Sequence, residues 1–174
     1  MARLPIIVAP DPRLKAKAEP VAAVDDAVRV LMDDMLETMY DANGIGLAAP
    51  QVGVLKRVIV LDVARQDQDS SPVAMANPEV IWESDDIAVR EEGCLSLPEY
   101  YAEVERPVSI RVTYLDRDNN TREIEVDDLM AVCIQHEIDH LNGLLFVDHV
   151  SSLKRNMILR KLTKAKRQGD LVTA

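Results

Sequence analysis

The sequence predicts an α+β fold in which antiparallel strands pack around a central helix with the HExxH pattern, flanked by an N-terminal amphipathic helix and a C-terminal helix. Two observations predict it. Apolar residues recur at helical spacing near both ends of the chain, and between them lie short stretches rich in β-branched residues, separated by turn residues. With 174 residues and 48% hydrophobic composition, residues 1–174 can bury a core as a single domain.

The first helix is expected in VDDAVRVLMDDMLETMYDANG, residues 24–44. Its apolar residues fall on one helical stripe, which consists of Val24, Val28, Leu31, Met32, Met35, Leu36 and Met39. Asn43-Gly44 ends the helix. We interpret this stripe as core and not as a ligand surface.

A glycine-rich turn, GIGLAAPQ at residues 44–51, follows the first helix. Its glycines allow the backbone to approach another group closely. The turn lacks the lysine of a phosphate loop, and a helix instead of a strand precedes it, so phosphate binding is not expected.

Short strands are expected next, with Asp118-Asn119-Asn120 as a hairpin turn between the last two. The expected strands are residues 57–63, 73–82, 86–93, 108–116 and 121–128. An exposed loop, residues 64–72, separates the first two. A second helix is expected from Asp128 and a last helix from about Ser151.

The segment HEIDH in the second helix is a candidate metal site. Residues four apart lie on the same helical face, so His136 and His140 can direct their imidazoles at one ion, with Glu137 beside it as a base. The alternative is one histidine in the core and one in solvent. The metal site is favoured because the apolar residues before HEIDH place both histidines on a buried stripe, where they need polar partners. These residues are Leu129, Val132 and Cys133.

A catalytic tetrahedral site needs a third protein ligand. The extended zincin pattern requires a histidine where this chain has Phe146. Cys133 is about 10.5 Å along the helix from His140, too far for one ion to bind both, so we assign it to a pocket wall. Cys94 in EEGCLSLP is the favoured ligand, because a glycine there lets the strand bend toward a helix, with Glu91-Glu92 at the rim. The alternative for Cys94 is a buried strand cysteine.

The charge distribution is uneven. The chain carries −10 overall, whereas residues 154–174, with seven basic residues and one aspartate, carry +6. The overall charge argues against DNA binding, and the basic C-terminal helix or tail is either a docking feature or a solvated helix with one apolar edge. No signal peptide or membrane span is expected, so we predict a cytoplasmic protein with reduced cysteines and no membrane partner.

Three segments together resemble the peptide deformylase family: GIGLAAPQ at residues 44–51, EGCLS at 92–96 and HEIDH at 136–140. They match the family patterns GxGxAAxQ, EGCxS and HExDH at every fixed position and in the same order. The resemblance implies an enzyme that hydrolyses the N-formyl group of N-formylmethionyl nascent peptides and releases formate. In some relatives a C-terminal helix docks on the ribosome, which the basic segment would suit.

The resemblance also implies roles for individual residues. The metal ligands would be Cys94, His136 and His140, and Glu137 would be the general base and acid. Gln51 and the backbone N–H of Leu95 would stabilise the oxyanion. The family implies Fe²⁺ as the native ion, with Zn²⁺, Ni²⁺ or Co²⁺ as substitutes.

Substrate contacts are expected on two sides of a groove. Gly44, Ile45 and Gly46 would pair with an extended peptide, and Tyr101 stands at a rim position where some relatives carry arginine. An apolar pocket for the methionine side chain would be lined by Leu129, Val132 and Cys133.

Two other functions and one residue stay open on the sequence alone. A zinc peptidase would use the same HExxH chemistry, and a metal or thiol sensor would use Cys94 and Cys133 as redox partners. Asp139 matches the family's fixed aspartate, with Arg106 as a candidate partner and solvent as the alternative. His149 is expected to be a surface or capping residue.

Overall fold

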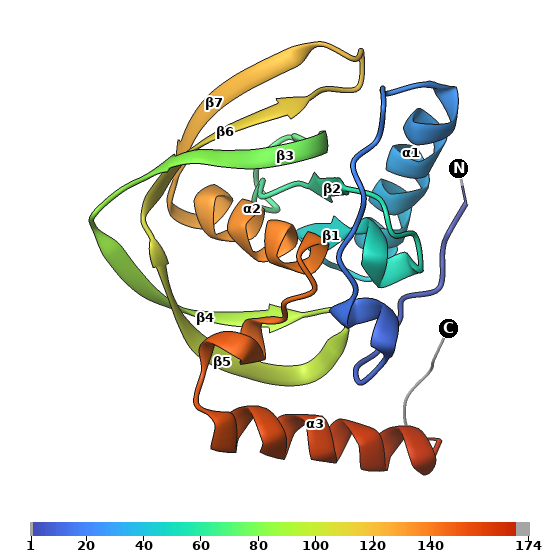
Figure 1. Ribbon diagram of the computed structural model, residues 1–174, viewed down its shortest axis with the longest axis vertical. Helices are drawn as coiled ribbons and strands as arrows, with labels where there is room; N and C mark the ends of the chain where they lie inside the picture. Colours follow the sequence, from blue (N-terminus) through green and yellow to red (C-terminus); the bar gives the residue numbers. More distant parts are fainter. Residues whose placement is uncertain (1, 170–174) are drawn as a thin grey trace.

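The computed structural model describes residues 2–169 and contains two antiparallel sheets and three α-helices (Figure 1). The five-stranded sheet has the order β1-β2-β3-β6-β7 and the two-stranded sheet pairs β4 with β5. The strands are β1 Gly46–Ala48, β2 Val58–Leu61, β3 Val73–Glu83, β4 Ile87–Cys94, β5 Leu97–Pro107, β6 Ser109–Leu115 and β7 Thr121–Asp127. The helices are α1 Asp26–Asp41, α2 Asp128–Leu141 and α3 Ser152–Arg167, with 3-10 turns η1 Pro12–Lys15, η2 Ala49–Val52 and η3 Phe146–His149. The expected α+β class with antiparallel sheets is confirmed.

Helix α1 forms as its apolar stripe predicts. The Asp25 carboxylate caps it by accepting the Val28 N–H at 2.9 Å. Met32, Met35 and Met39 are fully buried against β1 and β2, so the interpretation of this stripe as core is confirmed.

The five strands that the sequence predicts are all present, but β1 and β5 were missed. β1 is only three residues long, too short for an alternating pattern, and pairs with residues 59–61 of β2. β5 alternates buried and exposed residues, as a half-buried strand should. Its buried side carries Ala102 and Arg106 next to Val104, so its hydrophobic pattern is weak.

Helix α2, which carries HEIDH, contacts both sheets. It packs on β1, β2, β6 and β7 of the five-stranded sheet and on β5 of the two-stranded sheet (Figure 1). Residues of α2 therefore face side chains that come from both sheets.

Helix α3 packs with one apolar edge on the N-terminal segment and η3. Ile158 and Leu162 are buried there, and Lys166 Nζ donates to the carbonyl oxygens of Val8 at 2.6 Å and Pro10 at 3.2 Å. The expected basic segment 154–174 is thus helical as far as Arg167, and residues 170–174 lie outside the described part of the chain. None of the helices within residues 2–169 combines the length and the apolar character that crossing a membrane requires.

Candidate active site

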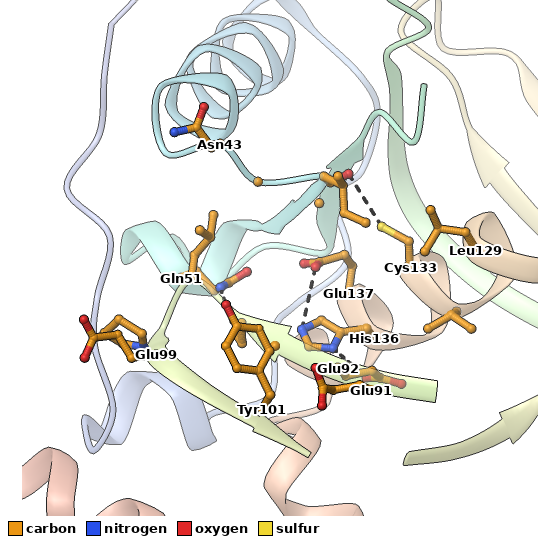
Figure 2. Close-up of a pocket in the computed structure, with 18 residues that line it drawn as sticks. Asn43, Gln51, Glu91, Glu92, Glu99, Tyr101, Leu129, Cys133, His136 and Glu137 are labelled. Carbon is orange, nitrogen blue, oxygen red and sulfur yellow. Dashed lines mark hydrogen bonds and ion pairs between the residues drawn. The ribbon is translucent and has the colours of Figure 1, made fainter. Parts of the chain in front are cut away.

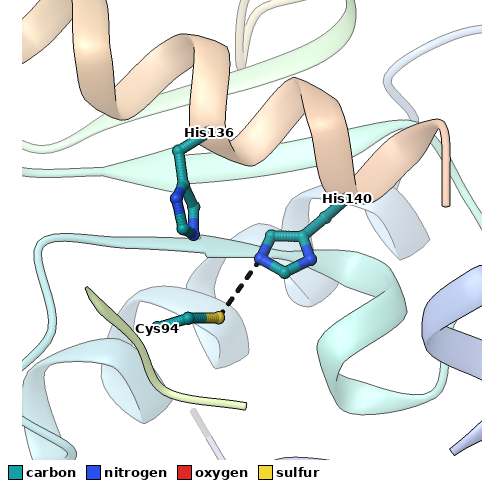
Figure 3. A group of neighbouring side chains, drawn as sticks. All are labelled: Cys94, His136 and His140. Atoms are coloured by element: carbon teal, nitrogen blue, oxygen red, sulfur yellow. Dashed lines mark hydrogen bonds between the residues drawn. The ribbon is translucent and has the colours of Figure 1, made fainter. Parts of the chain in front are cut away.

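Three side chains that the sequence nominates as ligands lie together in the structure (Figure 3). Cys94 ends β4, and His136 and His140 occupy successive turns of α2. Their ligand atoms lie within 4.8 Å of one another, and Cys94 Sγ is 3.4 Å from His140 Nε2. The ladder between β4 and β5 is irregular at this point, because Gly93 lies opposite Tyr101 and Cys94 lies opposite Leu97, so residues 98–100 of β5 have no partner on β4.

These three residues fit a divalent transition-metal ion. Ligands at Zn–S and Zn–N distances in a tetrahedral complex are about 3.4–3.6 Å apart, close to the spacing of Cys94 Sγ and His140 Nε2. His140 is 1% exposed, and its Nδ1 atom has no hydrogen-bond partner within residues 2–169. One thiolate with two imidazoles suits iron or zinc better than magnesium or calcium.

His136 is held by a buried ion pair behind it. Its Nδ1 atom is 2.9 Å from Glu92 Oε1, which leaves Nε2 to face the other two ligands. Arg106 donates to both oxygens of Glu92, from Nε at 2.6 Å and from Nη2 at 2.9 Å. Burial opposes ionisation of Glu92, but the hydrogen bonds from His136 and Arg106 lower its pKa to about 2. The expectation that Glu92 marks the rim is wrong, because its side chain is buried, with His136 and Arg106 as its partners.

Arg106 also binds Asp139, the residue whose partner the sequence left open. Arg106 Nη1 donates to Asp139 Oδ2 at 2.9 Å, so the candidate partner is confirmed and a solvated charge is excluded. His149 Nε2 lies 2.8 Å from the same oxygen. His149 therefore binds Asp139 from the end of η3, and its ring is only one-third exposed.

Glu137 lies beside the three ligands and is almost fully buried. It is 4% exposed, its Oε1 atom is 3.9 Å from His136 Nε2, and its Oε2 atom has no partner in the part of the chain that the structure describes. Burial raises the pKa of Glu137 to about 7. A carboxyl group with such a pKa can both accept and donate a proton near neutral pH.

Gln51 reaches the same place from η2. It is 1% exposed, so the surface position that a glutamine after a turn usually has is excluded. Its Nε2 atom donates to Ser96 Oγ at 3.0 Å and lies 3.5 Å from Cys94 Sγ, and its Oε1 atom accepts the Ala48 N–H. The N-terminal segment fixes this region, because Ile7 N donates to the Gln51 carbonyl.

A cavity of about 440 Å³ opens over Glu137 (Figure 2). All the substrate-contact residues expected from the sequence line it, namely Gly44, Ile45, Gly46, Tyr101, Leu129, Val132 and Cys133. A Cβ atom on Gly46 would lie 2.8 Å from Cys133 Sγ and 2.9 Å from Glu137 Oε1, so only glycine fits there. Leu129 is 40% exposed and lies at the mouth, which corrects its expected place on the buried stripe.

A model of the polypeptide deformylase family matches residues 3–156, which include every residue of this site. The chain belongs to this family. Peptide deformylases are metallohydrolases, and the resemblance that the three sequence segments suggested is confirmed. The family match ends near the start of α3, so most of that helix lies beyond it.

Deformylases of known sequence and structure are similar to the chain over nearly its whole length. Peptide deformylase of Methylocella silvestris is 61% identical over 164 residues, covering 92% of this chain and 84% of the relative. That of Agrobacterium fabrum is 56% identical and covers 94% of this chain and 96% of the relative. The crystal structure of peptide deformylase from Ehrlichia chaffeensis superposes with a TM-score of 0.92 at 39% identity, covering 98% of this chain and all of that one. The structure of the Ehrlichia chaffeensis enzyme in complex with actinonin gives the same TM-score at 41% identity, covering 96% of this chain and 99% of that one.

Sequence reasoning missed two residues that support the deformylase site. Arg106 was considered only for Asp139, although it also binds Glu92, and His149, expected as a surface or capping residue, is exposed as expected but also binds Asp139. The alternation of buried and exposed residues in β5 could have indicated this role of Arg106. It places the arginine on the buried side of the strand, where a cation needs an anionic partner.

Proposed function

We propose that the protein, as a single catalytic domain, removes the N-formyl group from N-formylmethionyl nascent peptides and releases formate. One observation supports this most directly: on Glu137 a buried carboxyl oxygen that has no partner among residues 2–169 lies beside a Cys-His-His cluster, and Glu137 lines the cavity. A base held ready in this way suits hydrolysis of an amide.

In this proposal Cys94, His136 and His140 hold the metal ion. We infer Fe²⁺ as the native ion, with Zn²⁺, Ni²⁺ or Co²⁺ as substitutes, since one thiolate and two imidazoles suit ions of this softness. Such an ion would polarise the formyl carbonyl and lower the pKa of a coordinated water toward 7. Glu92 supports the binding by fixing the ring of His136.

Glu137 moves the proton. Its carboxylate accepts a proton from the attacking water and then donates it to the amine that leaves with the peptide. Burial raises the pKa of Glu137, which makes its carboxylate a better proton acceptor than an exposed one.

Gln51 and Leu95 stabilise the negative charge that develops on the formyl oxygen. The Gln51 amide lies 3.5 Å from Cys94 Sγ, and the Leu95 N–H follows Cys94 directly in the chain. The Gln51 amide is held in place by its hydrogen bond to Ser96 Oγ, and loss of one oxyanion donor typically costs about 2.7 to 4 kcal/mol of barrier.

The peptide binds along β1 in this proposal. Among residues 2–169, β1 is the edge strand of the five-stranded sheet, so this edge can pair with an extended chain through Gly44, Ile45 and Gly46. The methionine side chain packs on Leu129, Val132 and Cys133, and Tyr101 closes the rim.

A formate-release assay tests the function. Freshly purified protein, handled anaerobically and analysed for its metal, should release formate from formyl-Met-Ala-Ser and leave an internal peptide bond intact. Cleavage of the internal bond would instead support a zinc peptidase. Absence of turnover with reversible oxidation of Cys94 and Cys133 would support a sensor.

We propose further that the basic segment 154–174 binds the ribosome, which places the enzyme in the cytoplasm beside nascent chains. Arg160, Lys161 and Lys164 are exposed on α3, whereas Ile158 and Leu162 are needed for packing. The test is therefore the triple change of these three cations to glutamate, which leaves the apolar edge intact. Co-sedimentation with ribosomes across a salt series should fall in this variant, and unchanged binding would contradict the proposal.

A further inference from the structure

The 3-10 turn η3 contacts the ligand His136 with its first residue. Phe146 is fully buried, and its ring stacks on that of His136 with the ring centroids 6.3 Å apart and the planes at 23°. The extended zincin pattern has its third histidine ligand at this position of the sequence. In this chain the position carries a flat apolar ring that packs on a ligand instead. Because protein interiors are close-packed, the ring of His136 cannot turn on this side without moving Phe146.

The last residue of η3, His149, begins a path of hydrogen bonds that leads to the same ligand. His149 Nε2 and Arg106 Nη1 lie 2.8 Å and 2.9 Å from one oxygen of Asp139. Arg106 binds both oxygens of Glu92, and Glu92 Oε1 lies 2.9 Å from His136 Nδ1. The exposed fraction of the side chains falls from 34% at His149 to 5% at Glu92. The path thus runs from the surface to the metal ligand.

The position of Arg106 depends on both carboxylates of this path. Its Nε and Nη2 atoms donate to Glu92 and its Nη1 atom donates to Asp139. The Asp139 side chain is partly exposed, and among residues 2–169 only Arg106 and His149 bind its carboxylate. Without His149 this carboxylate would be held by Arg106 alone. A less restrained Asp139 would loosen Arg106 and, through it, Glu92, the group that orients the ring of His136.

η3 is also anchored by contacts of its own. Asp148 Oδ2 accepts the Leu145 N–H at 2.8 Å and pairs with Lys15 Nζ at 2.7 Å, and Val147 is fully buried. None of these contacts includes a ligand residue, so they do not depend on a bound ion. η3 is therefore a firm support for the two residues that reach toward His136.

We propose that η3 is a positioning element of the metal site, in which Phe146 directly and His149 through Asp139 hold the ring of His136. By limiting the motion of this ring, the two residues slow the loss of the metal ion. This inference rests on the metal site of the proposed function. It adds to that site two positioning residues that are neither ligands nor part of the cavity lining.

The test measures how fast the protein releases its metal to an excess of a chromophoric chelator. The Co²⁺-loaded protein is used, because its visible absorption bands also report the geometry of the ligands. His149→Ala should release Co²⁺ about 3- to 10-fold faster than the unaltered protein, a smaller effect than that of losing a direct neighbour of a ligand. Its absorption bands should shift as well, which a loss of stability far from the site would not cause.

Two further variants separate positioning from packing. In His149→Gln the amide can donate from nearly the place of the imidazole Nε2 atom, so this variant should release Co²⁺ at nearly the original rate. Phe146→Leu keeps an apolar side chain but removes the flat ring from His136. It should speed the release and shift the absorption bands, measured well below its melting temperature.

A control and a double variant assign the effect to this path. Tyr40→Phe removes a hydrogen bond of 2.6 Å to the carboxylate of Asp62, which contacts none of the three ligands, and should leave the release rate unchanged. In Arg106→Met the path is already broken, so adding His149→Ala should change the release rate little. Residues that act through a shared partner are expected to be non-additive in this way.

The outcomes separate this inference from the proposed function. An unaltered release rate in His149→Ala, or equal acceleration in His149→Gln or Tyr40→Phe, overturns the path through Asp139. An unaltered rate in folded Phe146→Leu overturns the direct contact. An unaltered protein that binds no Co²⁺ overturns the proposed metal site, and this inference with it. A protein that holds Co²⁺ as described but releases no formate overturns the proposed function alone.

Discussion

Helices α1 and α2 pack on the same two strands, β1 and β2, but they bury different chemistry. α1 buries a stripe dominated by Met32, Met35 and Met39, whereas α2 buries His136, Glu137 and His140 among its apolar residues. Burial of an apolar side chain stabilises the fold, and burial of a polar one costs free energy unless it is paired. Burial of the polar groups of α2 therefore costs folding free energy, and hydrogen bonds from other elements offset this cost only in part.

The compensation comes from the two-stranded sheet. Glu92 of β4 and Arg106 of β5 bind His136 and Asp139, so this part of the α2 face is paired. Two groups are exceptions, because Glu137 Oε2 and His140 Nδ1 have no partner in residues 2–169. We infer that Glu137 takes part in the reaction, whereas Glu92 and Arg106 hold His136 and Asp139 in position.

The largest effect is expected for Glu137→Gln. Without a proton acceptor, turnover should fall by about 10²- to 10⁴-fold, because general acid–base groups contribute that much. The amide has nearly the same shape, so circular dichroism and metal content should not change. Turnover within a factor of a few of the unaltered protein would contradict the role of this residue.

The next effect is expected for Arg106→Met, which leaves the buried Glu92 carboxylate and the partly buried Asp139 without their arginine. Breaking a buried pair in this way should lower the free energy of unfolding by about 3 to 5 kcal/mol. Metal affinity should fall by about 10- to 100-fold, because Glu92 no longer orients His136 firmly. Urea unfolding and competition with a chromophoric chelator measure the two quantities.

Arg111→Met is the matched control for this prediction. Arg111 pairs with Glu125 on the exposed side of the sheet, where both side chains are about half exposed. Loss of that pair should change the free energy of unfolding by at most about 1 kcal/mol and leave metal affinity unchanged. Similar losses in the two variants would show that the buried pair has no special role.

A stability effect without a catalytic effect is expected in α1. Met35→Ala removes a fully buried side chain and should lower the free energy of unfolding by about 2 to 5 kcal/mol. Turnover per folded molecule, measured well below the melting temperature, should remain the same. A fall in turnover of the folded protein would show that α1 also supports the site.

The smallest effect is expected at the helix starts. Asp25 caps α1 through its side chain, whereas Asp127 at the start of α2 makes no such hydrogen bond. Asp25→Ala should therefore lower the free energy of unfolding by about 1 kcal/mol, and Asp127→Ala by clearly less. Thermal unfolding of the two variants side by side checks the difference, and equal losses would contradict the assignment of the cap.

The sequence predicted what depends on local pattern. The stripe of α1, five strands and the pairing of His136 with His140 all follow from spacing along one element. Cys94 was predicted because a metal site with His136 and His140 needs a third protein ligand. The three family segments then assigned Gln51 and Leu95, which spacing alone would not have done.

The rest depends on how distant segments meet. The contact between Glu92 and Arg106 exists because β4 and β5 pair in one particular register, which no local pattern fixes. β5 was missed because its buried side includes an arginine and an alanine, whose partners lie on other elements. Leu129 was misplaced for a similar reason, since helical spacing cannot show that the first turn of α2 projects beyond the core.

The register of β4 up to Gly93 and Cys94 determines how this chain tolerates changes in length. A strand side chain changes face when its register moves by one residue, so deleting a residue from β4 would turn Cys94 away from the histidines and Glu92 away from Arg106. The loop at residues 64–72 carries no such constraint on a ligand, and a residue could be lost or gained there with the site intact. Insertions and deletions should therefore be accepted between β2 and β3 and rejected between Ile87 and Leu97.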